Sequence, residues 1–561
     1  MNPVPKTRTR RAGTYRGVAL TAVSALALAA CGGTGGSPGG GTAAAEPAEL
    51  ECAVTDYAAD QQFTSPEPME VSMLWTDWPE SPVTDSWRIF DEIEERTNVR
   101  IVTTHVPFSD AVEKRGLLIA AGEAPTVIPL TYTGDERPFA ASGAVLPLSD
   151  YAEHMPNFNK YVDEWDLREM VDNLRQSDGR YYMTPGLQEV SVPMFSLIIR
   201  KDVFEEVGAP IPETWEELQT GLELIKEAYP DSLPLADGFE GQSMLNYASH
   251  AFGTVAGWGF GQGMFYNEST GDFEYAPTTD GYRDMVAYFR GLVDAGLLDT
   301  ESFTAPNDGT GTVTEKIAAE TVFAASGASG TVNEFAIALD AAGVTDYELA
   351  LLAPPGGEAG QVVEPRNFWH GFMVTAQAKD DPNLCSTIQF LDWLYYNPEA
   401  RELVQWGVEG ETYEKAEDGT ITLLPDFTYT AYNLNTDTGS TDIKVDLGWG
   451  NDVLAGGTES RVLKESYNQP GYVDYIDTVL SSRTPRDPFP PAPLDEMELE
   501  RASLQATPLK DSVDTATLQF ILGDRDMSEW DAFVSELGSS GLASYVELIN
   551  SAKDRWAEAN G

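Results

Sequence analysis

The sequence predicts an α/β protein with two or more lobes, and three observations support that fold class. The segments "SWRIFDEIEERTNVRIVTTHV" and "EKRGLLIAAGEAPTVIPLTY" each read as a helix followed by a strand, and such alternation is typical of lobes with largely parallel sheets. The chain has 561 residues, beyond the roughly 250 to 300 at which a single core stops growing. Hydrophobic residues make up 42% and aromatic residues 10%, enough to fill globular interiors.

The first ordered element is expected near the segment "MEVSMLWTDWP". Val71, Met73 and Trp75 alternate there with polar residues, as in a strand that buries one face. Phe90 and Ile93 mark the apolar face of the helix after it. That helix should end at Asn98, because asparagine tolerates the left-handed conformation of a helix C-cap.

Two later helices have well-marked starts. In "PETWEEL", Thr214 is a predicted N-cap with Glu217 three residues on, the spacing of a capping box. In "YYNPEARELVQWG", Asn397 precedes Pro398, and proline is favoured at the first helical position behind an asparagine cap.

The C-terminal third mixes regular and irregular patterns. "ETYEKAEDGTITLLP" predicts a hairpin that turns at Asp418-Gly419. Residues 425–500 are rich in Pro, Asp and Tyr, which predicts irregular loops over the body. "MSEWDAFVSELG" predicts a helix from Ser528 to Gly538 with one apolar stripe.

The N-terminal segment has the pattern of a secretory signal. Residues 1–17 contain basic residues and no acid, and Val18–Ala30 is uncharged. That apolar run would span about 20 Å as a helix, too short to cross a bilayer, so it predicts a signal peptide. Leu28-Ala29-Ala30-Cys31 resembles the lipobox of bacterial lipoproteins. We therefore expect a signal peptide at 1–30, a lipid on Cys31 and a Gly/Ala/Pro-rich tether at 31–66.

Charge limits the possible partners. The chain holds 90 Asp and Glu against 35 Lys and Arg, a formal net charge of −55. Such a surface repels nucleic acid and anionic lipid, so we expect no nucleic-acid partner. The field also disfavours a polyanionic ligand unless a local basic pocket overrides it.

Cysteine and histidine usage is sparse. Beyond Cys31, the cysteines are Cys52 and Cys385, which outside the cytoplasm either form one bridge or remain two isolated thiols. The four histidines show no zinc-ligand spacing with them. The sequence therefore predicts no metal and no cofactor.

Motifs of enzymes are absent from the sequence. It contains no G-x-S-x-G elbow, no H-E-x-x-H and no P-loop. The glycines of "GWGFGQG" at 257–263 do not fit the dinucleotide pattern G-x-G-x-x-G. We expect no enzyme and no catalytic residue, although a carboxylate pair for glycoside hydrolysis leaves an alternative open.

Several segments together resemble one family. They are "IIRKDVFEEVGAPIPETWEELQTGLELIKEAYP", "GVEGETYE" and the terminal "ILGDRDMSEWDAFVSELGSSGLASYVELINSAKDRW". From about residue 68 onward the chain is similar to extracellular solute-binding proteins of family 1. It resembles the lipidated, oligosaccharide-binding branch with LipO-like and alginate- or aldouronate-binding members.

The resemblance implies a two-lobed periplasmic-binding-protein-like fold of type II, with a ligand cleft between lobes. Lobe 1 is expected at 67–187 plus about 370–475, and lobe 2 at about 188–369 plus 476–561. Crossings are expected near 185–192, near 367–373 and around 470–490. Many relatives carry a calcium loop after the helix containing "TWEEL"; here "AYPDSLPLADGFEG" lacks its spaced ligands, so no calcium is expected there.

Candidate ligand contacts are aromatic and planar polar residues at strand ends and in loops. Sugars present apolar C–H faces and polar edges, which such groups recognise. A loop tryptophan can equally cap the core, so each candidate has a structural alternative. The candidates are Trp75, Asp77, Trp78, Tyr132, Trp258, Arg366, Trp369 and His370.

The predicted function is solute capture for import. The resemblance implies a monomeric, lipid-anchored binding protein on the outer face of a bacterial cell membrane. It would bind a small solute, an oligosaccharide by this resemblance, and deliver it to the permease subunits of an ABC transporter. Two alternatives remain open at this point: a lipoprotein glycoside hydrolase or lyase, and a surface adhesion lipoprotein without a small ligand.

Overall fold

The computed structural model describes residues 51–239, 241–256, 263–304, 311–417, 419–432, 434–436, 438–468 and 470–560. All of them belong to one compact unit. The expected signal peptide, Cys31 and the first part of the tether lie outside the described residues. No helix of the described part combines the length and the apolar character needed to span a membrane.

The first sheet has five strands in the order β2-β1-β3-β12-β4. β1 pairs in parallel with β2 and β3, whereas β12 is antiparallel to β3 and β4. The sheet is therefore mixed, because a strand from far along the chain inserts between β3 and β4. The strands are β1 (Met69–Asp77), β2 (Val99–Pro107), β3 (Val127–Thr131), β4 (Thr184–Leu187) and β12 (Phe368–Val374).

The second sheet has four strands in the order β10-β5-β9-β6. β5 is antiparallel to both β10 and β9, and only β6 and β9 run in parallel. The expectation of largely parallel sheets is wrong here. The strands are β5 (Ser196–Arg200), β6 (Leu235–Ala236), β9 (Ala324–Gly327) and β10 (Leu349–Leu351).

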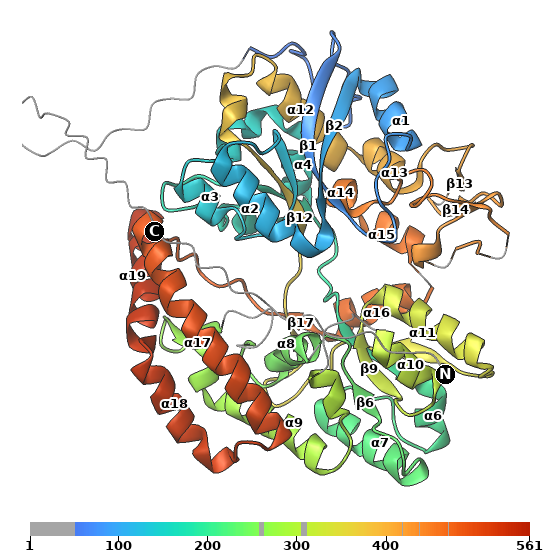
Figure 1. Cartoon of the computed structure of the whole chain (residues 1–561), viewed down its shortest axis with the longest axis vertical. Helices are drawn as coiled ribbons and strands as arrows, with labels where there is room; N and C mark the ends of the chain where they lie inside the picture. The colour runs from blue at the N-terminus through green and yellow to red at the C-terminus, as the bar shows by residue number, and fades with distance from the viewer. Residues whose placement is uncertain are drawn as a thin grey trace, which may run out of the picture. The chain divides into compact units, whose positions relative to one another are not determined.

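Helices cover both faces of each sheet (Figure 1). Around the first sheet lie α1 (Arg88–Thr97), α2 (Ala111–Ala121), α3 (Arg137–Ala141), α4 (Pro156–Glu164), α5 (Arg168–Asp172), α12 (Leu384–Tyr396), α13 (Pro398–Trp406), α14 (Asp452–Ala455) and α15 (Arg461–Tyr467). Around the second lie α6 (Lys201–Glu206), α7 (Trp215–Ala228), α8 (Gln242–Ala251), α9 (Asp280–Asp294), α10 (Gly311–Ala318), α11 (Ser329–Ala342), α17 (Glu496–Leu522), α18 (Trp530–Ser539) and α19 (Leu542–Asn560).

Alternation along each central strand explains why both faces are covered. In β1, Met73 and Trp75 point into one apolar cluster while Leu74 points into another on the opposite face. In β5, Leu197 and Ile198 divide in the same way between two clusters. Successive side chains of a strand face opposite sides, so these sequences require a helix layer on each side.

Four small two-stranded ribbons complete the chain. One of them is the predicted hairpin, with β13 antiparallel to β14, although residue 418 of its turn is outside the described residues. The ribbons are β7 (Met264–Asn267) with β8 (Asp272–Tyr275), β11 (Val362–Val363) with β17 (Thr484–Pro485), β13 (Tyr413–Lys415) with β14 (Ile421–Leu423), and β15 (Phe427–Thr428) with β16 (Thr441–Asp442).

Three connections run between the two sheets. Residues 188–195 link β4 to β5, residues 352–367 link β10 to β12, and the third follows α15 into α16 (Pro470–Ser482). The second connection was expected at 367–373, but β12 already begins at Phe368 within the first sheet. The connections share a small apolar cluster: Val190, Val192, Ala353, Tyr472, Tyr475, Ile476 and Val479.

Helix α16 corrects one expectation from sequence. Residues 425–500 were expected to be irregular, yet α14, α15, α16 and the start of α17 lie within them. Tyr472, Tyr475, Ile476 and Val479 repeat at helical spacing, and all four are buried in the cluster that joins the connections.

The segment before β1 is attached to the first lobe. Cys52 is disulfide-bonded to Cys385 of α12, with 5.1 Å between the two Cα atoms. Phe63 is fully buried in the core cluster of the first sheet. Residues 52–66 were expected to end the tether, but these contacts make them part of the folded body.

A buried carboxylate also holds this segment. Asp392 of α12 accepts hydrogen bonds from the hydroxyl of Tyr57 at 2.9 Å, from the side-chain amide of Asn157 at 2.7 Å and from the backbone N–H of Phe158 at 2.9 Å. Burial raises the pKa of Asp392 to about 6. The network joins the N-terminal segment, α4 and α12 at one point.

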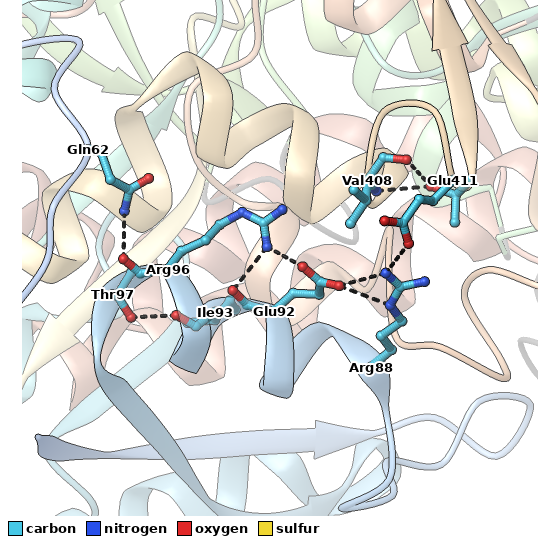
Figure 2. A network of polar contacts seen from close by, with 9 residues as sticks. Gln62, Arg88, Glu92, Ile93, Arg96, Thr97, Val408 and Glu411 are labelled. Atoms are coloured by element: carbon cyan, nitrogen blue, oxygen red, sulfur yellow. Dashed lines mark hydrogen bonds and ion pairs between the residues drawn. The ribbon is translucent and has the colours of Figure 1, made fainter.

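Helix α1 is fixed by a polar network on its surface (Figure 2). Arg88 lies 2.7 Å from Glu92 and also pairs with Glu411, while Glu92 pairs with Arg96. The side-chain amide of Gln62 donates to the carbonyl of Arg96 at 3.3 Å. The network therefore ties α1 to the N-terminal segment and to the loop after α13.

The predicted caps are mostly confirmed. Thr214 accepts a hydrogen bond from the backbone N–H of Glu217, but the carboxylate of Glu217 accepts from the backbone N–H of Glu213, so the expected capping box is incomplete. Asn397 caps α13 ahead of Pro398. Asn98 ends α1 in the left-handed conformation with φ of 59°. The predicted helix start at Ser528 is wrong, because that residue lies in a short 3-10 turn and α18 begins at Trp530.

Candidate functional site

The candidate site lies at one edge of the first sheet. β1, β2 and β3 are parallel, so their carboxyl ends meet at the same edge. β12 is antiparallel to β3 and therefore begins there, since Gly371 pairs with Thr131 and Phe368 pairs with Leu187 at the end of β4. Ligands of open α/β sheets bind outside the carboxyl ends of strands. Five strand ends thus place side chains at this edge.

Tyr132, Trp369 and His370 form an aromatic cluster at this edge. The ring centroids of Tyr132 and Trp369 lie 5.3 Å apart and nearly perpendicular, and those of Tyr132 and His370 lie 5.4 Å apart. Tyr132 keeps 46% of its surface exposed, and Trp369 is half-buried. The structure therefore brings Tyr132 together with two candidates that lie more than 230 residues later in the sequence, and it leaves an aromatic surface open to solvent.

Arg366 completes the cluster from the second connection. Its guanidinium lies 4.1 Å from the ring centroid of Trp369, within the range of a cation–π contact. The backbone N–H of Arg366 donates to the hydroxyl of Ser191 at 2.7 Å. Arg366 is thus anchored to the first connection by its backbone while its side chain lies on the tryptophan.

The backbone at the end of β3 is shaped to present Tyr132. Leu130 has a φ of 52°, a left-handed conformation that costs a non-glycine residue about 1–2 kcal/mol. The facing strand β12 has a register shift between Gly371 and Met373. A Cβ at Gly371 would collide with the carbonyl oxygen of Thr184, so only glycine permits this close approach. Backbone strain and bulges of this kind concentrate at functional sites.

His370 is neutral at physiological pH. It is only 2% exposed, and burial lowers the pKa of its imidazole to about 4. Its Nδ1 atom has no hydrogen-bond partner among the described residues. Gly456 packs against the imidazole, and a Cβ at that position would overlap the ring. His370 therefore packs against Tyr132 as a neutral aromatic ring and does not serve as a cation.

A second aromatic pair follows β1 and β2. The rings of Trp78 and Phe108 stack at 5.6 Å with an angle of 27°, and Phe108 is 58% exposed. Phe108 was missed from sequence, although it follows a strand end in the same way as Trp78. Asp77 positions the loop that follows β1: its carboxylate accepts from the backbone N–H of Val83 at 3.1 Å and lies 3.3 Å from His105 of β2.

Two of the expected contacts do not join the site. Trp75 is 0% exposed and packs against Trp87 and Phe90 in the core. It has no surface to offer a ligand, because its position within β1 points it to the helix layer. Trp258 lies outside the described residues.

Tyrosines from the C-terminal half were also missed. The rings of Tyr432 and Tyr467 lie 4.9 Å apart, and the carbonyl of Tyr432 accepts from the side chain of Asn333 on α11 at 3.2 Å. The Oδ1 atom of Asn333 has no partner among the described residues although the residue is buried. This contact joins a helix of the second sheet to a loop of the first lobe. Only the tertiary fold reveals it, because the two segments are about a hundred residues apart.

The acidic groups near the cluster are already engaged. Glu459 lies 3.0 Å from Lys464 and accepts from the hydroxyl of Tyr467. Asp452 lies 3.2 Å from Lys444. Asp135, which accepts from the backbone N–H of Tyr132 at 3.3 Å, is paired with Arg115 at 2.9 Å. None of these three carboxylates forms an ion pair with Arg366.

The chain belongs to the bacterial extracellular solute-binding protein family. Residues 88–408 match the family as a continuous stretch, which confirms the family predicted from sequence. Members of the family and the similar structures are substrate-binding proteins.

One curated relative spans nearly the whole chain. The polygalacturonan/rhamnogalacturonan-binding protein YtcQ of Bacillus subtilis (strain 168) is 23% identical over 518 residues, which cover 90% of this chain and 96% of YtcQ.

Two solved structures share the fold. The alginate-binding protein AlgQ2 has a TM-score of 0.66 at 17% identity and covers 88% of this chain and 99% of its own. FusA, the ABC-transporter substrate-binding protein of Streptococcus pneumoniae in complex with kestose, has a TM-score of 0.64 at 19% identity, covering 88% and 100%. The predicted two-lobed α/β fold class is thereby confirmed.

Proposed function

We propose that this protein captures an oligosaccharide outside the cytoplasm and delivers it to the permease of an ABC importer. The observation that carries the proposal is the pairing of Tyr132 and Trp369 at the carboxyl edge of the first sheet. An open aromatic surface suits the C–H faces of sugar rings, and the names of YtcQ and FusA describe sugar ligands. The lipid on Cys31 would hold the protein at the membrane surface.

The three connections suit a hinge. They share one small apolar cluster, and their backbones bond to one another, as between Gln188 and Asn367 at 2.9 Å. A few connecting residues can absorb the dihedral changes of domain closure. Ligand that contacts both lobes would favour the closed state by its difference in affinity for the two states. The closed form would then be the state that the permease recognises.

The test is a thermal-shift screen of the full-length protein against neutral and acidic oligosaccharides. A ligand at one hundred times its Kd stabilises the folded state by about 2.7 kcal/mol, so a true ligand gives a clear rise in Tm. The recovered sugar should be chemically unchanged by chromatography. Absence of any shift across both classes, or cleavage of the bound sugar, would refute the proposal.

A further inference from the structure

Arg366 differs from most cations of this chain in having no acidic partner. With 90 acidic and 35 basic side chains, most described lysines and arginines have a carboxylate within 4.0 Å, including half-buried Arg88 and buried Arg200. Among the described residues, the guanidinium of Arg366 makes neither an ion pair nor a hydrogen bond. Its contact is the face of Trp369.

Three other arginines near the connections have no ion pair among the described residues, and each donates to at least one backbone carbonyl. Arg401 is buried and donates to the carbonyls of Thr458, Leu454 and Ala455. Arg483 donates to the carbonyl of Pro354 at 2.7 Å. Arg486 lies over the ring of Phe489 and donates to the carbonyl of Asp487 at 2.9 Å, although its Nε atom has no partner. Such bonds satisfy a guanidinium without an acid. Arg366 has no comparable acceptor among the described residues.

Leaving a half-buried guanidinium unmatched is unfavourable. Partial removal from water penalises the charge, and burial lowers the pKa of Arg366 below its usual value. Two carboxylates, Glu364 and Glu459, act on it from beyond ion-pair distance. Glu364 is exposed, and Glu459 is held by Lys464 and Tyr467. An acceptor supplied from outside would offset the penalty.

The geometry identifies the chemistry of that acceptor. A guanidinium offers five N–H donors in a planar fork that matches a carboxylate in two parallel hydrogen bonds. The guanidinium of Arg366 lies over the ring of Trp369, and Tyr132 meets the same tryptophan in a nearly perpendicular arrangement. A ring that contacts these aromatic residues would therefore place a substituent near the guanidinium.

We infer that the oligosaccharide bound here carries carboxylates, as a uronic-acid sugar does, and that Arg366 is the residue that selects for them. This inference rests on the proposed function and assigns the class of its ligand. Arg366 binds the carboxylate, and Trp369 with Tyr132 contacts the sugar rings. The net charge of −55 repels a long polyanion, so the preferred ligand is a short acidic oligosaccharide.

The inference is tested by calorimetry of the full-length protein with matched pairs of sugars. Each pair consists of a uronic-acid trimer (galacturonate, mannuronate or glucuronate) and its fully methyl-esterified form, which keeps the shape and removes the charge. We expect at least one acidic trimer to bind about tenfold or more tightly than its ester, because a charge-assisted hydrogen bond contributes about 1.5–3 kcal/mol.

Variants of Arg366 test whether this residue causes the preference for the acidic sugar over its ester. Arg366→Gln should abolish the difference between acid and ester, and Arg366→Lys should retain part of it, because lysine keeps the charge without the fork. Arg88→Gln is the matched control: Arg88 also lies over a tryptophan, 5.6 Å from the centroid of Trp449, but is paired with Glu92. Its removal should leave both affinities unchanged.

The possible results separate the inference from the proposed function. Neutral oligosaccharides that bind while no acidic trimer is preferred would overturn the inference and leave oligosaccharide capture intact. An acid preference that survives in Arg366→Gln would overturn the role of Arg366. Binding of neither class would overturn the proposed function and this inference together. The comparison of acid and ester in the unmodified protein does not depend on how a variant folds.

Discussion

Removal of the Cys52–Cys385 disulfide should destabilise the first lobe strongly. The bridge joins residues separated by 333 positions, so its loss frees a very long loop in the unfolded chain. The chain-entropy relation gives an upper value of about 6 kcal/mol for a loop of this length. Denatured chains retain structure that reduces this figure. We therefore expect Cys52→Ala/Cys385→Ala to lower the free energy of unfolding by about 3–5 kcal/mol.

The assay is guanidinium unfolding of the full-length protein, followed by circular dichroism and tryptophan fluorescence. Non-coincident transitions would show that the two lobes do not unfold in one step. Reductant should shift the unmodified protein to the same midpoint and should not affect the double variant. The reasoning fails if the double variant lies within about 1 kcal/mol of the unmodified protein, because Phe63 and the Tyr57–Asp392 bond would then suffice to hold the segment.

Four further outcomes are expected. Burial lowers the pKa of His370 in the folded protein to about 4, below its usual 6.5. The free energy of unfolding should therefore be constant above about pH 6.5 as far as His370 is concerned, and should fall as the pH is lowered toward 4. In a pH series of unfolding, His370→Gln should reduce the slope of the free energy of unfolding against pH in this range by up to about 1.4 kcal/mol per pH unit. Trp369→Ala should weaken oligosaccharide binding about tenfold or more by calorimetry, whereas Trp165→Ala, a half-buried tryptophan elsewhere in the first lobe, should not; equal losses would contradict the site. Arg401→Met should cost about 3 kcal/mol in denaturant unfolding because three backbone carbonyls, two of them buried, lose their donor, and a change below about 1 kcal/mol would show that water replaces it. Cys31→Ser should move the protein from the membrane fraction to the soluble fraction on cell fractionation, and retention in the membrane would refute lipid anchoring.

Local elements were the part of the fold that sequence predicted well. Thr214, Asn397 and Asn98 each cap a helix through contacts within one turn, so the residues that determine a cap are neighbours in the sequence. Helix α16 was missed because Pro, Gly and Asp around it suggest loops, and its apolar stripe is stable only against the connections that it packs on. Phe63 likewise needs a distant core to be buried.

The candidate site was predictable as a set of residue types but not as a constellation. Trp75 and Trp78 are three residues apart, yet one is fully buried and the other lies beyond the strand end. The position of that end depends on pairing with β2, which no local pattern determines. Tyr132 meets Trp369 only because β12 inserts antiparallel beside β3. Tyr132 and Trp369 are so far apart in the sequence that their contact can be found only from the tertiary fold.

The most direct measurement is a crystal structure of the protein with an oligosaccharide that raises its Tm. The sugar should lie at the carboxyl edge of the first sheet, with one ring against Trp369 and Tyr132. Density for the sugar at any other surface, with these two side chains still facing solvent, would contradict ligand capture at this edge.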